Sequence, residues 1–432
     1  MPMLAPRFVA LSAALSAALS LACCRTPGGD LKKEETIQTK NAAADAGTPA
    51  PSDSGAHDAA SIHRRAVAID MHADTVQFML DEGADINQRL TTTHLDSVRM
   101  REGGLDAQFF SIWVEPQFYG LGGERAVARA DEQIKAVRSL AEQQPETWVL
   151  ATTAEDVRRA AREGKLAALL GLEGGYAIDE KLESVERYYR MGVRYISPTW
   201  TYSVSWAGSS GDGGGRNVGL NDFGRQVIRE MNRLGIIVDV SHVSDKTFWD
   251  IVETSTKPVV ATHSNCRAIV NVARNLTDEQ IQAIAKTGGV VSVVFYPGFV
   301  EPGWMERKNL LDREIEHQVR EAGRNAEGGG SAKRIARDRV REREYARRLS
   351  MPTVARVVDH IDHVVKLVGV DHVGVGSDFD GIPATPEGLS SVADLPNLTA
   401  ELLRRGYTEE DVAKILGGNI LRVMEEVERG TQ

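Results

Sequence analysis

Histidine and carboxylate side chains recur in this 432-residue chain directly after short apolar runs, where burying a polar group is otherwise costly. His72 and Asp74 are two residues apart, so on a strand both side chains point to the same face. The other residues of this kind are Glu173, His242, His263 and Asp378. Imidazole nitrogen and carboxylate oxygen are ligands that zinc accepts. Because carboxylates held close together repel one another, the set predicts a pair of divalent cations with a bridging carboxylate.

The fold must bring these residues together. Past Ser61 the chain repeats one pattern, in which an apolar run is followed by a loop and then by an amphipathic segment. The expected strands are 66–74, 105–114, 166–173, 193–200, 236–242, 258–263, 289–296 and 372–380. Continuous apolar runs are typical of parallel strands that are buried on both faces. Eight such units favour a closed α/β barrel of the (β/α)8 TIM type over an open, doubly wound sheet. Functional side chains of such a barrel lie at the C-terminal ends of its strands, where the six residues fall.

Helix signals lie between the expected strands. Asn221-Asp222 opens a segment that ends before Gly235, and 277–280 has the pattern of a capping box. One segment, about 301–350 after the seventh strand, departs from the repeated pattern. It is dense in Arg and Glu and contains Gly328-Gly329-Gly330. We predict an inserted helical hairpin with the glycines at its turn and with its charges on solvated faces.

The N-terminal region indicates export. Residues 1–24 resemble a signal peptide, with Arg7 before an apolar run that is too short to span a bilayer comfortably. The run ends at Cys23 and Cys24 in a sequence similar to a bacterial lipoprotein box, with either cysteine as the lipidated residue and plain secretion as the alternative. Residues 25–60 lack apolar periodicity, which predicts a flexible linker. We expect a barrel over 61–432, exported and lipid-anchored to the outer or cell membrane on its periplasmic or exterior side, or otherwise secreted.

Charge and cysteine content argue against two classes of protein, nucleic-acid-binding proteins and disulfide-stabilised domains. The net charge is −10 at pH 7, and no basic stretch suits phosphate neutralisation, so we expect no nucleic-acid partner. Two of the three cysteines lie in the leader, which leaves Cys266 alone and excludes a disulfide framework in the body of the protein.

The remaining histidines lack the same context. His360 and His363 lie three apart on an expected helix at 353–368, and we assign both to structure rather than to chemistry. His372 enters the eighth strand at its N-terminal end, away from the expected site. The others, for which the sequence suggests no partner, are His57, His63, His94 and His317.

The order and spacing of the motifs resemble those of the membrane (renal) dipeptidase family, the amidohydrolase-like zinc peptidase family M19. The similarity covers nearly everything from about Ser61 to Val427. The motifs are Asp70-x-His72-x-Asp74, Gly171-x-Glu173-Gly174, Asp239-x-Ser241-His242, His263-Ser264, Arg274-Asn275, Gly376-x-Asp378-Phe379-Asp380-Gly381 and Leu416-Gly417-Gly418-Asn419.

The resemblance implies a role for each residue. His72 and Asp74 would bind one zinc ion, His242 and His263 the other, and Glu173 would bridge both. Asp378 would act with Glu173 in catalysis, as the acid/base for the proton of the metal-bound water. Arg274 would bind the terminal carboxylate of the substrate, for which guanidinium geometry is suited.

One position departs from the family pattern. After the fourth strand the family carries a histidine thought to polarise the scissile carbonyl, whereas this chain has Trp200. An indole can donate one hydrogen bond but carries no charge. Loss of one oxyanion donor typically costs about 10²–10³ in rate. We expect Trp200 and Tyr296 at the barrel mouth, with Tyr202 and Trp206 nearby, as substrate-binding side chains or as ordinary packing.

The function implied by the resemblance is that of a zinc-dependent dipeptidase, which would cleave dipeptides, including those with a C-terminal D-residue, by a hydroxide bridging two zinc ions. One alternative is a binuclear zinc amidohydrolase acting on a non-peptide amide, ester or lactone. The reason to consider it is Trp200, which replaces the family's histidine. A further alternative is a non-catalytic peptide-binding lipoprotein, against which Asp378 argues because a binder needs no proton carrier. The expected partners are a small peptide, a lipid anchor and, as in many family members, a second copy of the chain.

Overall fold

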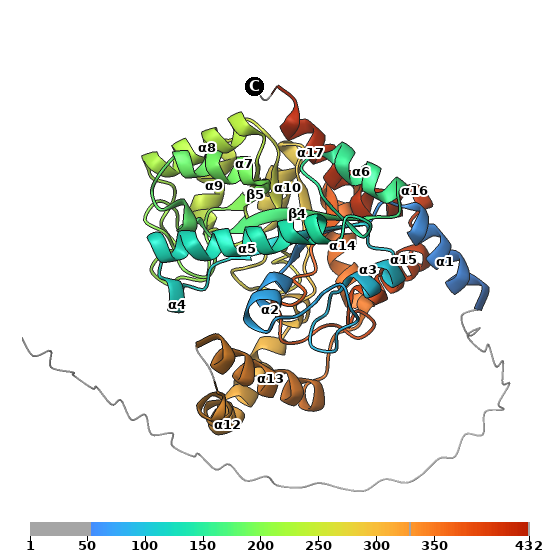
Figure 1. The fold of residues 1–432 in the computed structure, drawn as a ribbon. Helices are drawn as coiled ribbons and strands as arrows, with labels where there is room; N and C mark the ends of the chain where they lie inside the picture. Colours follow the sequence, from blue (N-terminus) through green and yellow to red (C-terminus); the bar gives the residue numbers. More distant parts are fainter. Residues whose placement is uncertain (1–52, 328–329, 431–432) are drawn as a thin grey trace, which may run out of the picture. The chain divides into compact units, whose positions relative to one another are not determined.

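The computed structural model describes residues 53–327 and 330–430, drawn as a ribbon in Figure 1. The expected signal peptide and lipidated cysteine lie outside the described residues, as does the linker up to residue 52. The predicted end of the linker at residue 60 is wrong, because helix α1 (Asp53–Arg65) spans it. Ala59 and Ile62 of this helix are buried, and α1 packs against α15 (Leu395–Arg404). Two apolar residues within a polar segment are a weak sequence signal. The start of the folded unit was therefore predicted too late.

Eight parallel strands close into a barrel, which confirms the expected (β/α)8 architecture. The strands in ring order are β1 (Ile69–Ala73), β2 (Ala107–Trp113), β4 (Leu166–Glu173), β5 (Val193–Ser197), β6 (Ile237–Asp239), β7 (Val259–Ala261), β8 (Val290–Val293) and β9 (Val373–Val375). Each lies within its predicted range. The sequence missed only the short β3 (Trp148–Leu150), which pairs with the start of β4 outside the ring.

Helices surround the barrel, as Figure 1 shows. They are α2 (Thr75–Asp81), α3 (Ser97–Gly103), α4 (Pro116–Tyr119), α5 (Glu124–Gln143), α6 (Ala154–Arg162), α7 (Glu183–Met191), α8 (Asp222–Leu234), α9 (Asp245–Thr254), α10 (Asp278–Lys286), α11 (Pro297–Val300), α14 (Val354–Val368), α16 (Glu409–Ala413) and α17 (Asn419–Glu428). The predicted caps are present: Asn221 accepts a hydrogen bond from the Gly224 N–H, and Thr277 forms a capping box with Gln280. Among the described residues, no helix combines the length and apolarity that a membrane span requires.

The alternation of side chains along each strand divides the core in two. On β4, Ala167 and Leu169 join the cluster inside the barrel, whereas Ala168 and Leu170 pack outward with the surrounding helices. Apolar residues of α6 and α17 belong to the inner cluster together with the first residues of several strands. These two helices therefore close the N-terminal end of the barrel and leave the C-terminal end for polar side chains.

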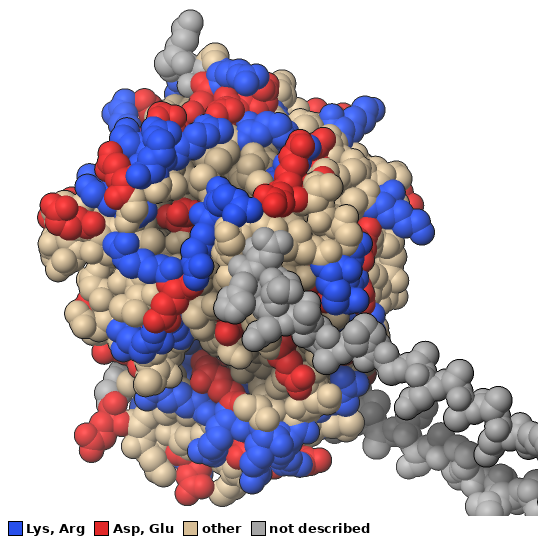
Figure 2. Space-filling view, turned by 90° about the vertical axis from the view of Figure 1, so that its right-hand side faces the viewer, with Lys and Arg blue, Asp and Glu red and all other residues tan. Residues whose placement is uncertain are grey.

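The inserted segment is a helical hairpin, as predicted, made of α12 (Trp304–Asn325) and α13 (Gly330–Arg348). A small separate core holds the two helices together, with Trp304, Ile315 and Tyr345 fully buried in it. The outer faces carry ion pairs such as Arg320–Glu316, in which both side chains are exposed. Figure 2 shows acidic and basic side chains interspersed on one face of the molecule, including its lower end, where the hairpin lies in Figure 1.

Candidate metal centre

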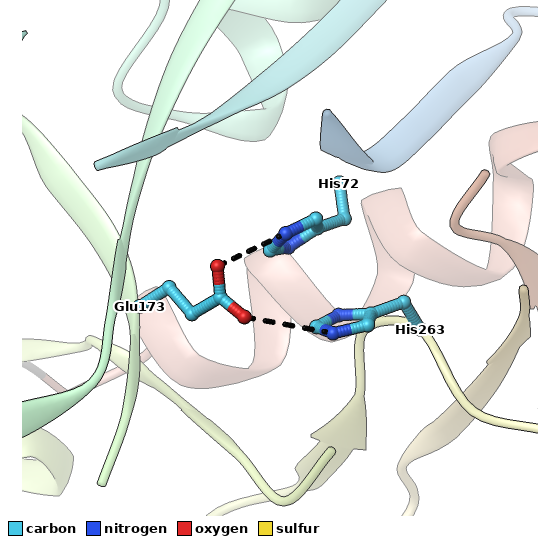
Figure 3. A group of neighbouring side chains, drawn as sticks. All are labelled: His72, Glu173 and His263. Carbon is cyan, nitrogen blue, oxygen red and sulfur yellow. Dashed lines mark ion pairs between the residues drawn. The ribbon is translucent and has the colours of Figure 1, made fainter. Parts of the chain in front are cut away.

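Residues from five strands meet at the C-terminal mouth of the barrel. His72 lies on β1 and Glu173 ends β4, while the other residues follow strands directly. Those others are Asp74 after β1, His242 after β6, His263 after β7 and Asp378 after β9. Figure 3 shows the His72 and His263 rings beside each other, both facing the carboxylate of Glu173. The six residues singled out in the sequence therefore form one cluster.

The two oxygens of Glu173 face two different sets of side chains. Oε2 lies 3.3 Å from Nε2 of His72. Oε1 lies 2.9 Å from Nε2 of His242 and 3.7 Å from Nε2 of His263. A carboxylate with one oxygen in each set has the geometry of a bridging ligand.

Several donor atoms in the cluster lack ordinary partners. Nε2 of His72 is buried without a hydrogen bond, 3.6 Å from Oδ2 of Asp74 and 4.0 Å from Oδ1 of Asp378. Nε2 of His242 lies 2.9 Å from Nε2 of His263. Nitrogen atoms that face each other, beside buried carboxylates, are a donor set suited to divalent cations. Ligand atoms come within 4.8 Å of one another in His72, Glu173 and His263, and again in His72, Asp74 and Asp378. The residues present therefore fit the binding of divalent metal.

The pKa values of the two candidate catalytic residues, Asp378 and Glu173, are shifted in opposite directions. Burial raises the pKa of Asp378 well above its ordinary value, and the carboxylates of Asp74 and Glu173 add to this effect. Burial also acts on Glu173, but the imidazoles of His72 and His242 outweigh it and hold the pKa of Glu173 well below its usual range. Of the two carboxyl groups, Asp378 therefore has the higher proton affinity, as a residue that accepts and passes on a proton requires.

Residues behind the ligands hold the imidazole rings in place. Nδ1 of His72 lies 2.8 Å from the hydroxyl of Tyr195 on β5. This contact explains Gly171 of the Gly171-x-Glu173 motif, because a Cβ atom there would lie 1.9 Å from the Tyr195 ring. Nδ1 of His263 lies 2.8 Å from Oγ1 of Thr262. Such outer partners fix the orientation of metal-ligating histidines.

A cavity of about 430 Å³ opens over the cluster. The three side chains expected to contact substrate, Arg274, Trp200 and Tyr296, all line it. Tyr202 is 41% exposed and Trp206 is buried, and the described residues that line the cavity include neither of them.

Arg274 is half-buried beside the second set of candidate ligands and lines the cavity. Its Nη1 donates to the carbonyl oxygen of Ser241, and its Nη2 lies 3.2 Å from Nε2 of His242. Burial lowers the pKa of Arg274 to about 10, so the side chain keeps its charge at neutral pH. A cation is thus held at the edge of the cluster.

Trp200 forms part of an aromatic wall. Its ring lies 4.8 Å from that of Trp113 in an edge-to-face arrangement and 6.4 Å from the ring of His242, measured between centroids. The side chain at this position is therefore next to the cluster, as the alignment of motifs implied, but it brings no charge to it.

The inserted hairpin supplies one residue of the cavity lining that the sequence did not indicate. Arg334 of α13 lines the cavity, and its Nε lies 3.2 Å from a carboxylate oxygen of Glu115, two residues after β2. The expectation that the charges of the hairpin are all solvated is thus wrong at Arg334, because the hairpin packs across the barrel mouth. Charge periodicity alone does not show which arginine faces inward.

Comparison with known proteins gives consistent matches. Residues 56–432 match the family model described as membrane dipeptidase (peptidase family M19). Dipeptidase tcpJ of Claviceps purpurea is 32% identical over 340 residues, which cover 78% of this chain and 69% of that protein. The solved structure of the probable dipeptidase PvdM from Pseudomonas aeruginosa aligns with a TM-score of 0.74 at 26% identity, over 87% of this chain and 99% of that one. A metallopeptidase from Rhodobacter sphaeroides, solved with a phosphinate mimic of the dipeptide L-Ala-D-Ala, aligns with a TM-score of 0.68 at 27% identity, over 84% of this chain and 99% of that one.

Proposed function

The chain belongs to the membrane dipeptidase family, peptidase family M19, and is a metallo-dipeptidase; from this premise we propose that it cleaves dipeptides with two zinc ions held by the barrel-mouth cluster. His72 and Asp74 would hold one ion, His242 and His263 the other, with Glu173 between them. The observation that carries the proposal is the placement of Glu173, whose oxygens lie 3.3 Å from His72 Nε2 and 2.9 Å from His242 Nε2.

The chemistry divides between the ions and the chain. Bound divalent cations supply the Lewis acidity that polarises a carbonyl group and makes water a nucleophile near neutral pH. The carboxylate of Asp378 would take a proton from the attacking water and then pass that proton to the departing amine. Arg274, a half-buried cation at the edge of the cluster, would bind the C-terminal carboxylate of the dipeptide and so orient the scissile bond.

Substrates with a D-residue at the C-terminal position form part of the proposal. The relative from Rhodobacter sphaeroides was solved with a mimic of L-Ala-D-Ala, and its fold matches this chain over 84% of the length of this chain. In the proposed orientation, Arg274 would bind the terminal carboxylate of either stereoisomer, and the cavity walls would decide which side chain fits.

Trp200 favours a second candidate function, hydrolysis of a non-peptide amide, ester or lactone by the same cluster. Its uncharged indole lies 6.4 Å from the ring of His242, between ring centroids, where the family has a charged partner for the carbonyl oxygen. A weaker hydrogen-bond donor at this position would slow the hydrolysis of substrates with a poor leaving group, such as an amine, more than the hydrolysis of substrates with a good one. Activated esters would therefore be cleaved more readily than peptides under this candidate.

Export and anchoring through Cys23 or Cys24 complete the proposal, with the enzyme facing the periplasm or the exterior. A lipid anchor, a small peptide substrate and a second copy of the chain are the proposed partners. Mass spectrometry of the membrane fraction tests the anchor, since a diacylglyceryl group on either cysteine would support it and an unmodified, freely released protein would contradict it.

The test of function compares the purified protein with its Asp378→Asn variant. L-L and L-D dipeptides are supplied to the zinc-loaded proteins, and released amino acids and bound zinc are measured. Cleavage that disappears in the variant while two zinc ions per chain remain would support the proposal. If both proteins bind two zinc ions and neither cleaves any dipeptide, the proposal fails and a panel of activated esters and lactones tests the second candidate.

A further inference from the structure

The turn that carries Asp378 has an unusual backbone conformation. Asp378 has φ of +63° and Asp380 has φ of +66°, both in the left-handed region that L-residues rarely adopt. Residues held there are strained and keep this conformation only when their surroundings impose it. The position of the Asp378 carboxyl group therefore depends on the groups that fix this turn.

His94, a histidine without an expected partner, makes reciprocal hydrogen bonds with Asp380. The backbone N–H of His94 donates to Oδ1 of Asp380 at 2.5 Å, and the backbone N–H of Asp380 donates to Nδ1 of His94 at 2.9 Å. The His94 ring also packs against the ring of Phe379, with 5.4 Å between centroids. His94 thus contacts both residues that follow Asp378.

The same turn is tied to the metal-binding strand. The second oxygen of Asp380 accepts a hydrogen bond from Oγ1 of Thr75 at 2.6 Å, directly after Asp74. The side chain of Asp380 is only 1% exposed, so water competes little for these bonds. Asp380 therefore links the loop of His94, the turn of Asp378 and the end of β1.

Space around the Asp378 carboxyl group is narrow. A Cβ atom on Gly381 would lie 2.6 Å from Oδ1 of Asp378 and 2.2 Å from Oδ2 of Asp74. A small rotation of the turn would therefore move Asp378 relative to the ligand set. Reacting groups misplaced by about 1 Å can lose roughly 100-fold in rate.

We propose that His94 is a positioning residue: acting through Asp380, it fixes the left-handed turn and with it the place of the Asp378 carboxyl group. His94 does not line the cavity over the metal cluster, so its effect is transmitted by the turn. The kinetic consequence rests on the proposed function, whereas the effect on the turn is a property of the folded chain and can be measured without a substrate.

Two substitutions at one position separate the hydrogen bond from the bulk of the ring. His94→Leu removes the acceptor at Nδ1, whereas His94→Asn places an amide oxygen near the same point. The readouts are kcat and KM for the best dipeptide of the panel, bound zinc, and hydrogen–deuterium exchange of the peptide containing 377–381. We expect His94→Leu to lower kcat roughly 10- to 100-fold at unchanged KM and zinc content. Exchange in the turn should become several-fold faster, as the loss of one sheltered hydrogen bond of about 1 kcal/mol implies, and His94→Asn should restore most of both.

Each outcome decides the proposal. Exchange in the turn that is as slow in His94→Leu as in the unaltered protein would overturn it, and so would faster exchange with unchanged kcat. If His94→Leu loses zinc or unfolds, His94→Phe, which keeps a ring against Phe379 but has no acceptor at the position of Nδ1, gives the answer: a lower kcat with zinc retained supports the proposal, and an unchanged kcat overturns it. If the unaltered protein cleaves no dipeptide, the proposed function fails, and the exchange rates alone decide whether His94 fixes the turn.

Discussion

The hydroxyl of Tyr195 lies 2.8 Å from Nδ1 of His72, on the side of the ring opposite the nitrogen that faces Glu173. Both residues are fully buried, and Gly171 on the neighbouring strand leaves the space that the tyrosine ring occupies. A phenol in this place orients the imidazole and adjusts its basicity, a role more often filled by a carboxylate or a carbonyl oxygen.

Removing this hydroxyl should weaken metal binding. We expect Tyr195→Phe to lower zinc affinity by about 10–100-fold, the usual effect of losing an outer partner of a ligand, with little change in fold because the ring remains. Competition with a chromophoric chelator measures the affinity. Tyr188→Phe is the matched control, since Tyr188 is equally buried but donates to the Ala177 carbonyl oxygen. Equal zinc affinity in both variants would contradict a role for Tyr195.

The close approach at Gly381 gives a second prediction. An added methyl group would lie 2.2 Å from Oδ2 of Asp74, so Gly381→Ala must displace that carboxylate or the turn itself. We expect kcat/KM to fall by about 100-fold or more, while the melting temperature changes little. Gly213→Ala, where a methyl group meets nothing within 4 Å, is the control and should behave as the unaltered protein does. Activity that survives in Gly381→Ala would show that neither carboxylate needs its present position.

The gathering of the six candidate residues at the barrel mouth was predictable from sequence because each is a polar residue at the end of an apolar run. In a closed parallel barrel, all such strand ends meet at one mouth, so type and spacing were sufficient. Tyr195 was not predictable in the same way. It lies inside a strand like any core aromatic residue, and its role depends on standing opposite Gly171 in the register of β4 and β5.

Long-range loop contacts were also beyond the sequence. His94 reaches Asp380 across 286 positions, and Arg334 reaches Glu115 from a helix whose pattern of charges suggests solvent on all sides. Periodicity shows which elements form but not how a loop or an inserted hairpin lies over the mouth. For the same reason the start of the folded unit was placed too late, since the burial of Ala59 and Ile62 depends on packing of α1 against α15.

His360 gives a prediction about pH and stability. Its Nδ1 accepts from the Cys266 N–H at 3.1 Å, its Nε2 lies 3.1 Å from the Val300 carbonyl oxygen, and burial lowers its pKa to about 4. The folded state therefore prefers the neutral ring, whereas the unfolded chain binds a proton near pH 6.5. Its contribution is fully present above about pH 6.5 and is lost as the pH falls toward 4.

The measurement is urea unfolding at pH 7 and pH 5, for the unaltered protein and for His360→Gln. The unaltered protein should lose about 2 kcal/mol more between the two pH values than the variant does, as the linkage relation requires for this shift. His63, which burial also leaves with a pKa of about 4, contributes equally to both proteins and cancels from the comparison. Parallel losses in the two proteins would mean that His360 is not the group responsible.

The last prediction concerns Trp200. If the missing charge beside His242 limits peptide cleavage, Trp200→His should raise kcat for dipeptides by about 100-fold, the lower end of the range usually attributed to one oxyanion donor. Trp200→Phe controls for the altered aromatic wall, because it keeps a ring against Trp113 but has no donor. A gain with histidine and none with phenylalanine would show that peptide hydrolysis in this protein is held back at the carbonyl oxygen. A loss in both variants would instead mean that the indole contacts the substrate, and would shift the choice of substrates toward those with an apolar group next to the cleaved bond.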